Sequence, residues 1–187
     1  MGAYREDLDR MLQTDRLILR TWRPDDFEAY AEMSAEPEVM QFVAPDGKPL
    51  TRFAAWQGFC AVLGHWQLRG FGMFAVIERS SREFVGRVGP WHPEGWPGFE
   101  IGWTIRSKFW GRGYATEAAR RSIEFAFNEL HRYSVISLID PDNVRSIRVA
   151  ERVGERPDGT VTLPDMPGKT ILKYSANKIS WSNNFTP

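Results

Sequence analysis

The segment from Phe99 to Glu117 constrains the fold more than any other part of the chain, because it joins three kinds of structure without a linker. It begins with FEIGWTI, which has the composition of a buried strand. Gly111 and Gly113 then interrupt the chain, and apolar residues from Ala115 onward recur at helical spacing. A strand that passes through a glycine turn into an amphipathic helix is typical of an α/β fold, in which the helix packs on the sheet.

Period-two patterns precede this segment. FGMFAVIE and EFVGRVGPW are separated by a turn at Ser80 and Ser81 and predict a β-hairpin. The strand at 99–105 follows after the turn-forming stretch PEGWPG. Because both connections are short, we expect these three strands to pair antiparallel.

Capping and spacing predict the remaining elements. Thr51 is a good N-cap for a long helix, and Gly154 stands where a later helix would end. Glu117 and Arg121 share the outer face of the helix after the glycine turn, at the spacing of an ion pair. The predicted elements outside the three-strand series are strands at 16–22, 134–139, 159–163 and 169–175, and helices at 24–34, 51–68, 115–130 and 144–153.

The resulting order, β-α-α-β-β-β-α-β-α-β-β, describes an α/β (α+β) domain. We expect a mainly antiparallel sheet of six to seven strands flanked by about four helices. With 187 residues, of which 42% are hydrophobic, the chain is long enough for one core, and we place a single domain at 1–175. The stretch ANKISWSNNFTP at 176–187 has no periodicity, so we expect a loose or partner-contacting C-terminal tail.

The charge balance argues against a general nucleic-acid binder. Lys and Arg together number 24 and Asp and Glu also 24, whereas proteins that contact many phosphates carry a basic excess. Cys60 is the one cysteine, and His65, His92 and His131 are not at ligand spacing, so we expect no metal site.

The sequence also predicts a cytoplasmic protein without a membrane segment. Its first ten residues are charged and lack the apolar stretch of a signal peptide. No apolar run approaches the roughly 18–20 residues that span a bilayer. A homodimer is compatible with this composition, and the sequence leaves the oligomeric state open.

The glycine turn is a candidate anion site. Glycines let the backbone approach a ligand closely, and a helix start presents unpaired N–H groups at the positive end of its dipole. Arg112 lies between Gly111 and Gly113 and adds a cation. Glycine before a helix is equally common where nothing binds, so both interpretations stay open here. The turn is neither a Walker loop, which needs G-K-[ST], nor a Rossmann fingerprint, because Thr116 replaces the last small residue.

Three segments together resemble the GNAT N-acetyltransferases. WGRGYATEA resembles the family's acetyl-coenzyme A signature [QR]-x-x-G-x-[GA], which maps to positions 110–115. DNVRSIRVAERVG at 142–154 resembles the second family block, and LQTDRLILRTWRPDD resembles the first strand of the ribosomal-protein N-acetyltransferase branch. The resemblance covers about residues 12–175 in the family order. It departs from the pattern at Trp110, where the family has Gln or Arg, and at Ala150, where many members have Tyr.

The resemblance implies acetyl-coenzyme A as co-substrate, with no metal. It implies that the strand at 102–105 splays from the strand at 134–139, and that the pantetheine arm lies in the gap. A backbone N–H of Thr104 or Ile105 would polarise the thioester carbonyl. The residues implied to bind the cofactor are Thr104, Ile105, Gly111, Arg112, Gly113, Tyr114, Ala115, Thr116 and Asn143.

Two residues are candidates for proton transfer. Glu100 is an acidic residue in an otherwise apolar strand, where burial would raise its pKa toward that of a general base. Equally, it is an exposed residue or a salt-bridge partner of Arg87, because strand phase does not fix its face. In the ribosomal-protein branch a serine that maps to Ser146 carries the acid role of the missing tyrosine. Asn143 and Ser146 also have structural interpretations, as the N-cap and N3 residues of the same helix.

Trp91, His92 and Trp96 bracket the loop before the key strand and are candidates to line an acceptor pocket. Packing at the edge of the hairpin is the alternative for all three. Trp56 and Trp66 have core spacing on the second helix.

We therefore expect an N-acetyltransferase that moves the acetyl group of acetyl-coenzyme A to a primary amine. The acceptor is a protein N-terminus or a small-molecule amine. A non-catalytic coenzyme A binding or interaction module is the alternative, supported by the departures at Trp110 and Ala150.

Overall fold

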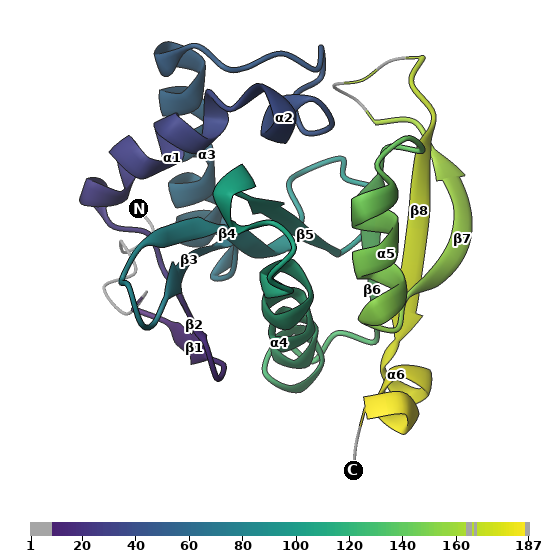
Figure 1. The fold of residues 1–187 in the computed structure, drawn as a ribbon. Helices are drawn as coiled ribbons and strands as arrows, with labels where there is room; N and C mark the ends of the chain where they lie inside the picture. Colours follow the sequence, from purple (N-terminus) through teal and green to yellow (C-terminus); the bar gives the residue numbers. More distant parts are fainter. Residues whose placement is uncertain (1–8, 164–165, 167, 186–187) are drawn as a thin grey trace.

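The computed structural model describes residues 9–163, 166 and 168–185, and shows one eight-stranded sheet (Figure 1). The strand order is β1-β2-β3-β4-β5-β6-β8-β7. The strands are β1 (Met11–Gln13), β2 (Leu17–Arg20), β3 (Phe74–Glu78), β4 (Phe84–Trp91), β5 (Glu100–Ile105), β6 (Ser134–Ile139), β7 (Arg156–Val161) and β8 (Ile171–Asn177).

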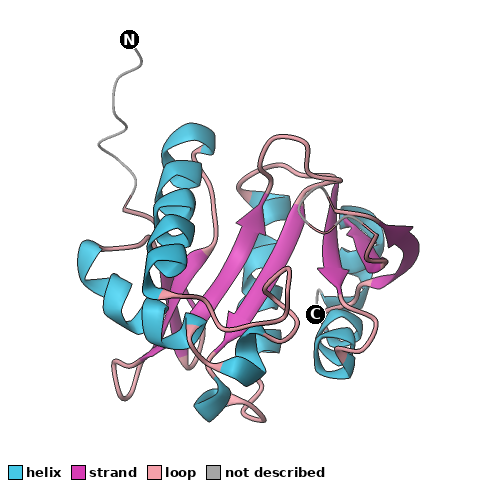
Figure 2. Cartoon of the chain, turned by 90° about the horizontal axis from the view of Figure 1, so that it is seen from above, coloured by secondary structure: helices cyan, strands magenta, loops and turns pink. Residues whose placement is uncertain are grey.

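Helices cover both faces of this sheet (Figure 2). They are α1 (Phe27–Ser34), α2 (Pro37–Met40), α3 (Arg52–Arg69), α4 (Tyr114–Asn128), α5 (Val144–Arg152) and α6 (Lys178–Phe185), with 3₁₀ turns at Pro24–Asp26 and Ser107–Phe109. In the part of the chain that the structure describes, no helix combines the length and the hydropathy of a membrane span.

The expected α/β architecture with a mainly antiparallel sheet is confirmed. β3, β4 and β5 form the predicted antiparallel series, with Val88 opposite both Phe74 and Trp103. Thr51 caps α3 by accepting a hydrogen bond from the Ala54 N–H at 3.2 Å, as the sequence predicts.

β5 and β6 run parallel and pair where Glu100 lies opposite Ile136. The backbone N–H of Ile136 donates to the Phe99 carbonyl at 2.9 Å at this point. Beyond it the two strands part, as expected for 102–105 and 134–139, and leave a gap in the middle of the sheet.

α4 packs on β4 and β5 and supplies the centre of the core. Its apolar face is as predicted: Ala118, Ile123, Ala126 and Phe127 are at most 1% exposed. Phe125 meets Phe74 of β3 with ring centroids 5.5 Å apart. The position of α4 is therefore fixed by packing along its length, which holds its N-terminus beside the gap.

The structure adds elements to the expected count. It has eight strands where six to seven were expected, because Met11–Gln13 pairs with β2 as a short edge strand. The described residues form six α-helices where about four were expected. α2 has four residues, too few to show a helical period in the sequence.

The C-terminal segment differs from the expected loose tail. β8 continues to Asn177, and α6 follows directly. The Trp181 indole is buried, stacks edge-on against Phe127 at 5.6 Å and donates to the Val153 carbonyl at 2.6 Å. Lys178 adds hydrogen bonds to the Phe127 and Tyr133 carbonyls, and isolated contacts of this kind leave no periodic signal in the sequence.

Two side-chain expectations are wrong. Trp66 is buried as predicted, but Trp56 is 50% exposed and packs on Phe27 at the surface. Glu117 does not pair with Arg121 along the helix; it pairs with Arg16 of the β1–β2 turn. The Arg16–Glu117 pair joins the β1–β2 turn to the first turn of α4.

Candidate active site

The gap between β5 and β6 opens into two pockets that meet at Trp103, Thr104, Asn143 and Ser146. The first runs from this junction to the start of α4 and has a volume of about 360 Å³. Eight of the nine residues expected to bind the cofactor line it: Thr104, Ile105, Gly111, Gly113, Tyr114, Ala115, Thr116 and Asn143.

The turn before α4 has the backbone conformation that only glycine adopts easily. Gly111 and Gly113 have φ values of +77° and +79°. The N–H of Glu117 donates to the Gly113 carbonyl at 3.0 Å, which is the first bond of the helix. The N–H groups of the preceding residues of α4 therefore have no partner within the helix, and these residues line the pocket.

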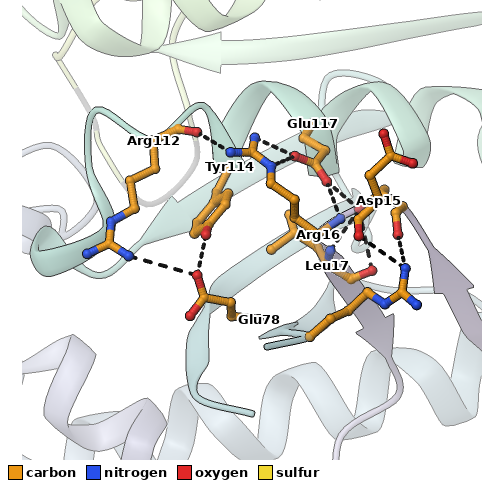
Figure 3. Close-up of polar contacts among 9 residues, drawn as sticks. Asp15, Arg16, Leu17, Glu78, Arg112, Tyr114 and Glu117 are labelled. Atoms are coloured by element: carbon orange, nitrogen blue, oxygen red, sulfur yellow. Dashed lines mark hydrogen bonds and ion pairs between the residues drawn. The ribbon is translucent and has the colours of Figure 1, made fainter. Parts of the chain in front are cut away.

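Arg16 braces this turn from the outside (Figure 3). Its guanidinium donates to the Arg112 carbonyl at 2.9 Å and to Glu117 Oε2 at 2.7 Å. The backbone N–H of Arg16 and the hydroxyl of Thr14 both donate to the other oxygen of Glu117. The β1–β2 turn thus holds the loop and the first turn of α4 in one rigid unit, formed from residues about a hundred positions apart.

Arg112 and Tyr114 both direct their side chains toward Glu78 (Figure 3). The Tyr114 hydroxyl donates to Glu78, and the Arg112 guanidinium lies 3.8 Å from the same carboxylate. Hydrogen bonds from Ser81 and Tyr114 lower the pKa of Glu78, and burial only partly opposes them. Arg112 is the one expected cofactor residue that does not line the pocket, because Glu78 directs its side chain elsewhere.

Sequence reasoning overlooked a basic row on α5. Arg145, Arg148 and Arg152 line the first pocket opposite the N-terminus of α4. Their spacing of three and four residues places them on one helix face, so the sequence held a signal for them. Their charges suit a polyanionic ligand.

Trp110, at the position where the family has Gln or Arg, plays a structural part. Its indole N–H donates to the Ile105 carbonyl at 2.8 Å, which ties the loop to the end of β5. The Arg145 guanidinium lies 3.7 Å from the centre of its ring. The departure from the family pattern therefore leaves the backbone of the glycine turn in place.

The second pocket continues from the junction toward the start of β5 and has a volume of about 240 Å³. Trp91, Trp96 and Trp103 form aromatic walls, and Glu100 and Asp140 supply carboxylates. Lys169 pairs with Asp140 at 2.7 Å. Burial raises the pKa of Asp140, but the hydrogen bonds from Lys169 and from the Asp142 N–H outweigh burial and leave this pKa below its ordinary value.

Glu100 shares a strand face with Gly102 and Thr104 and lines this pocket. It is only 8% exposed, and the Trp96 indole N–H donates to its Oε2 at 2.7 Å. A Cβ at Gly102 would lie 2.5 Å from the Met73 methyl group, so glycine at 102 lets Met73 approach beside Glu100. Arg87, offered as an alternative partner of Glu100, instead donates to Thr104 and Tyr30.

His92 does not line either pocket among the described residues. Its backbone N–H donates to His65 Nε2 at 3.1 Å, and His65 Nδ1 lies 2.8 Å from the Phe71 carbonyl. Because the carbonyl only accepts, the proton of His65 sits on Nδ1. His65 stacks on Trp91 with ring centroids 4.5 Å apart, so it supports the pocket wall from behind.

Asn143 and Ser146 meet at the junction of the two pockets. Asn143 Oδ1 accepts from the Ser146 N–H at 3.1 Å and caps α5, so the cap does not use the amide NH₂ of Asn143, a residue that lines both pockets. The Trp103 indole N–H donates to Ser146 Oγ at 3.2 Å. Since the indole only donates, the hydroxyl proton of Ser146 is free for another acceptor.

Comparison with known proteins agrees with this geometry. The sequence profile of the acetyltransferase (GNAT) domain matches residues 16–156. The uncharacterized protein YkkB of Bacillus subtilis is 32% identical over 173 residues, which cover 89% of this chain and 96% of YkkB.

Solved structures share the fold. An acetyltransferase from Agrobacterium tumefaciens superposes with a TM-score of 0.80 at 32% identity, covering 90% of this chain and 95% of that one. RimJ of Mycobacterium smegmatis, solved in complex with CoA-disulfide, superposes with a TM-score of 0.70 at 20% identity, covering 91% and 84%. The profile spans most of the chain and includes both the glycine turn and α5, so the chain belongs to the GNAT acetyltransferase family.

Proposed function

We propose that this protein transfers the acetyl group of acetyl-coenzyme A to a primary amine that binds in the Glu100 pocket. The continuous groove carries this proposal: it begins at the unpaired amides of α4, passes between β5 and β6, and ends at a buried carboxylate. When bound, acetyl-coenzyme A supplies the acetyl group as a thioester.

The residues of the first pocket fit the anionic part of this co-substrate. The amides from Gly111 to Thr116 would hold the pyrophosphate, and the arginines of α5 would add charge-assisted contacts. Asn143 would contact the pantetheine arm through its NH₂ group, because its oxygen is used as the helix cap.

Backbone direction along β5 favours one of the two expected donors to the thioester carbonyl. Ser137 reaches the Ile101 carbonyl and Trp110 reaches the Ile105 carbonyl, both on the open side of β5. The N–H and C=O groups of alternate residues point to the same side of a strand. Ile105 N–H therefore faces the gap, whereas Thr104 N–H faces β4, and Ile105 is the better candidate.

Glu100 would accept a proton from the acceptor ammonium group. The hydrogen bond from Trp96 fixes the orientation of the carboxylate, and Glu100 lines the pocket. The nearby aromatic walls limit access of water, which strengthens the attraction between the carboxylate and an ammonium group. Ser146 would donate its free proton to the departing thiolate, because Trp103 already satisfies its oxygen.

A panel of peptides with free N-termini and small amines, incubated with acetyl-coenzyme A and read by mass spectrometry, tests this proposal. We expect an acetylated product with at least one acceptor and little product with the Glu100→Gln variant. The control is coenzyme A binding by calorimetry, which the variant should retain. Binding with no product from any amine would support the non-catalytic module instead.

A further inference from the structure

Glu155 is a buried carboxyl group that the proposed reaction does not use. Its exposed fraction is 0%, and its Oε2 has no hydrogen-bond partner among the described residues. An ionised carboxylate in such a place is strongly unfavourable, so the burial of Glu155 needs a physical explanation.

The end of α5 explains why the side chain points inward. Gly154 has φ +91°, its N–H donates to the Glu151 carbonyl at 3.1 Å, and the Glu155 N–H donates to the Ala150 carbonyl at 3.0 Å. These two bonds form a Schellman motif, which folds the residue after the glycine back onto the helix. That position is usually apolar, and here it is a glutamate.

The contacts of Ser137 show whether the neutral or the ionised form of the Glu155 side chain fits its surroundings. Ser137 Oγ lies 2.8 Å from the Ile101 carbonyl oxygen and 3.0 Å from Glu155 Oε1. A hydroxyl has one proton, and a carbonyl oxygen only accepts, so Ser137 donates to Ile101. The remaining contact needs a proton from Glu155. A neutral Glu155 supplies it, whereas an ionised Glu155 would compete with Ile101 for the Ser137 proton.

The charges around Glu155 act in the same direction. Burial, together with repulsion from Glu100 on β5, raises the pKa of Glu155 to about 8. The neighbour from β6 is the uncharged Ser137, which would lower this pKa only by donating to an ionised carboxylate, and Ile101 competes for that proton. The Arg156 guanidinium, at the start of β7, donates to the backbone oxygen of Glu155 at 3.3 Å.

We propose that Glu155, in its neutral form, is a positioning residue for the proposed reaction: through Ser137 it ties β6 to β5 where the strands part. It thereby leaves Glu100 without a second negative charge behind it. This role rests on the acetyl transfer proposed above. Ionisation of Glu155 would break the tie, so we expect kcat to fall at alkaline pH and assign that fall to Glu155.

Glu155→Gln tests this role, because an amide donates to Ser137 as a neutral acid does but never ionises. We expect kcat of this variant at pH 7 to stay within about twofold of wild type. We expect the wild-type fall in kcat above about pH 8 to disappear in the variant. An alkaline fall of the same size and position in Glu155→Gln would overturn the proposal.

Glu155→Leu is the matched control, since leucine fills the space without donating a proton. It should lower kcat several-fold at every pH, as should Ser137→Ala, and combining the two should add little because both break one link. A Glu155→Leu variant whose kcat and pH profile equal those of Glu155→Gln would also overturn the proposal.

Infrared spectroscopy of the wild-type protein separates this inference from the proposed function. A protonated carboxylic acid has its own C=O band, and we expect one such band to persist at pH 7 and to lose half of its intensity near pH 8. The measurement needs neither a variant that folds nor a known acceptor. Acetyl transfer without this band would overturn the inference about Glu155. The band without acetyl transfer to any amine would overturn the proposed function alone.

Discussion

The two ends of the groove are built in different ways. At the phosphate end, where we propose that the pyrophosphate binds, the backbone amides of Gly111 to Thr116 form one contiguous stretch, and charged contacts from Arg16 hold its shape. The acceptor end, where we propose that the acceptor binds, combines Glu100 of β5 with Trp96 of the preceding loop and, through Ser137 of β6, with Glu155 after α5, and it relies on buried hydrogen bonds. We infer that conformation decides function at the phosphate end, whereas single side-chain atoms decide it at the acceptor end.

Glu100→Gln should have the largest effect and should act at the acceptor end alone. Glutamine keeps the shape and accepts the Trp96 hydrogen bond, but it cannot take a proton from the amine. General-base assistance contributes about 10²–10⁴-fold, so we expect a loss of kcat/KM in that range at neutral pH. The measurement is the steady-state rate from pH 6 to pH 10 with one acceptor amine.

The loss should shrink at high pH, where more of the amine is already neutral. Coenzyme A affinity, measured by calorimetry, should match wild type because Glu100 does not line the first pocket. A small loss, or one that does not vary with pH, would assign Glu100 a structural role and leave deprotonation of the amine to water.

Gly113→Val breaks the phosphate end through its backbone. At φ +79° a β-branched residue is strained by roughly 1–2 kcal/mol, and relief of that strain would turn the amides away. The nearest atom to an added Cβ is Arg16 Nη2 at 3.6 Å, so crowding within the protein is not the cause. We expect coenzyme A affinity to fall roughly tenfold or more, about 1.4 kcal/mol or more.

Gly159→Val is the matched control. Gly159 has φ +86° and open space around its Cβ position, but it lies in β7. Both variants should lose similar stability in thermal unfolding, and only Gly113→Val should lose affinity for coenzyme A. Equal affinities of the two variants would show that the phosphate position is elsewhere.

The same contrast explains how much the sequence could predict. The glycine turn, α4 and the cap at Asn143 depend on neighbouring residues, so spacing and residue type located them. Glu155 and the Arg16–Glu117 pair depend on contacts between distant segments, and no local pattern indicates them. Trp181 is similar, because its burial follows from docking on α4.

For Glu117 and Trp56, the local sequence pattern predicts a contact that the tertiary structure does not form. Glu117 has ideal spacing to Arg121, yet the β1–β2 turn offers it a backbone N–H, a hydroxyl and a guanidinium at once. Three donors outweigh one flexible surface pair, which contributes about 0.3–0.5 kcal/mol. Trp56 has core spacing, but the helix presents more apolar surface than the sheet covers.

Ser146→Ala should have a smaller effect, at the junction of the two ends. A neutral hydrogen bond contributes about 1 kcal/mol, so kcat should fall roughly threefold to tenfold with little change in KM. Trp103→Phe should lower kcat in the same direction, because it removes the N–H that orients the hydroxyl. Together they should lose no more than Ser146→Ala alone, as a double-mutant cycle would measure.

Ala150→Tyr should not rescue Ser146→Ala. Ala150 is 0% exposed and packs against Ile139 and Tyr174, so a tyrosine there has no space to reach the groove. Rescue of kcat by this substitution, or an unchanged kcat in Ser146→Ala, would remove the serine from the mechanism.

The smallest expected effect concerns His65, which packs behind the Trp91 wall of the second pocket, and it is a dependence of stability on pH. Burial lowers the pKa of His65, and its neutral ring accepts the His92 N–H while it donates to Phe71. The unfolded chain therefore binds this proton more readily than the folded protein does, so stability falls as pH drops below about 6.5.

Protonation of His65 also removes the acceptor at Nε2. His92 should then exchange its amide hydrogen faster, roughly threefold to tenfold for the loss of about 1 kcal/mol. Hydrogen-exchange NMR at pH 7 and pH 5, corrected for intrinsic rates, measures this, with the Glu117 amide as reference for the phosphate end. Equal protection of His92 at both pH values, with the His65 ring shown by NMR to be protonated at the lower one, would mean that its amide does not depend on His65, and that the stacking of His65 on Trp91 holds the wall instead.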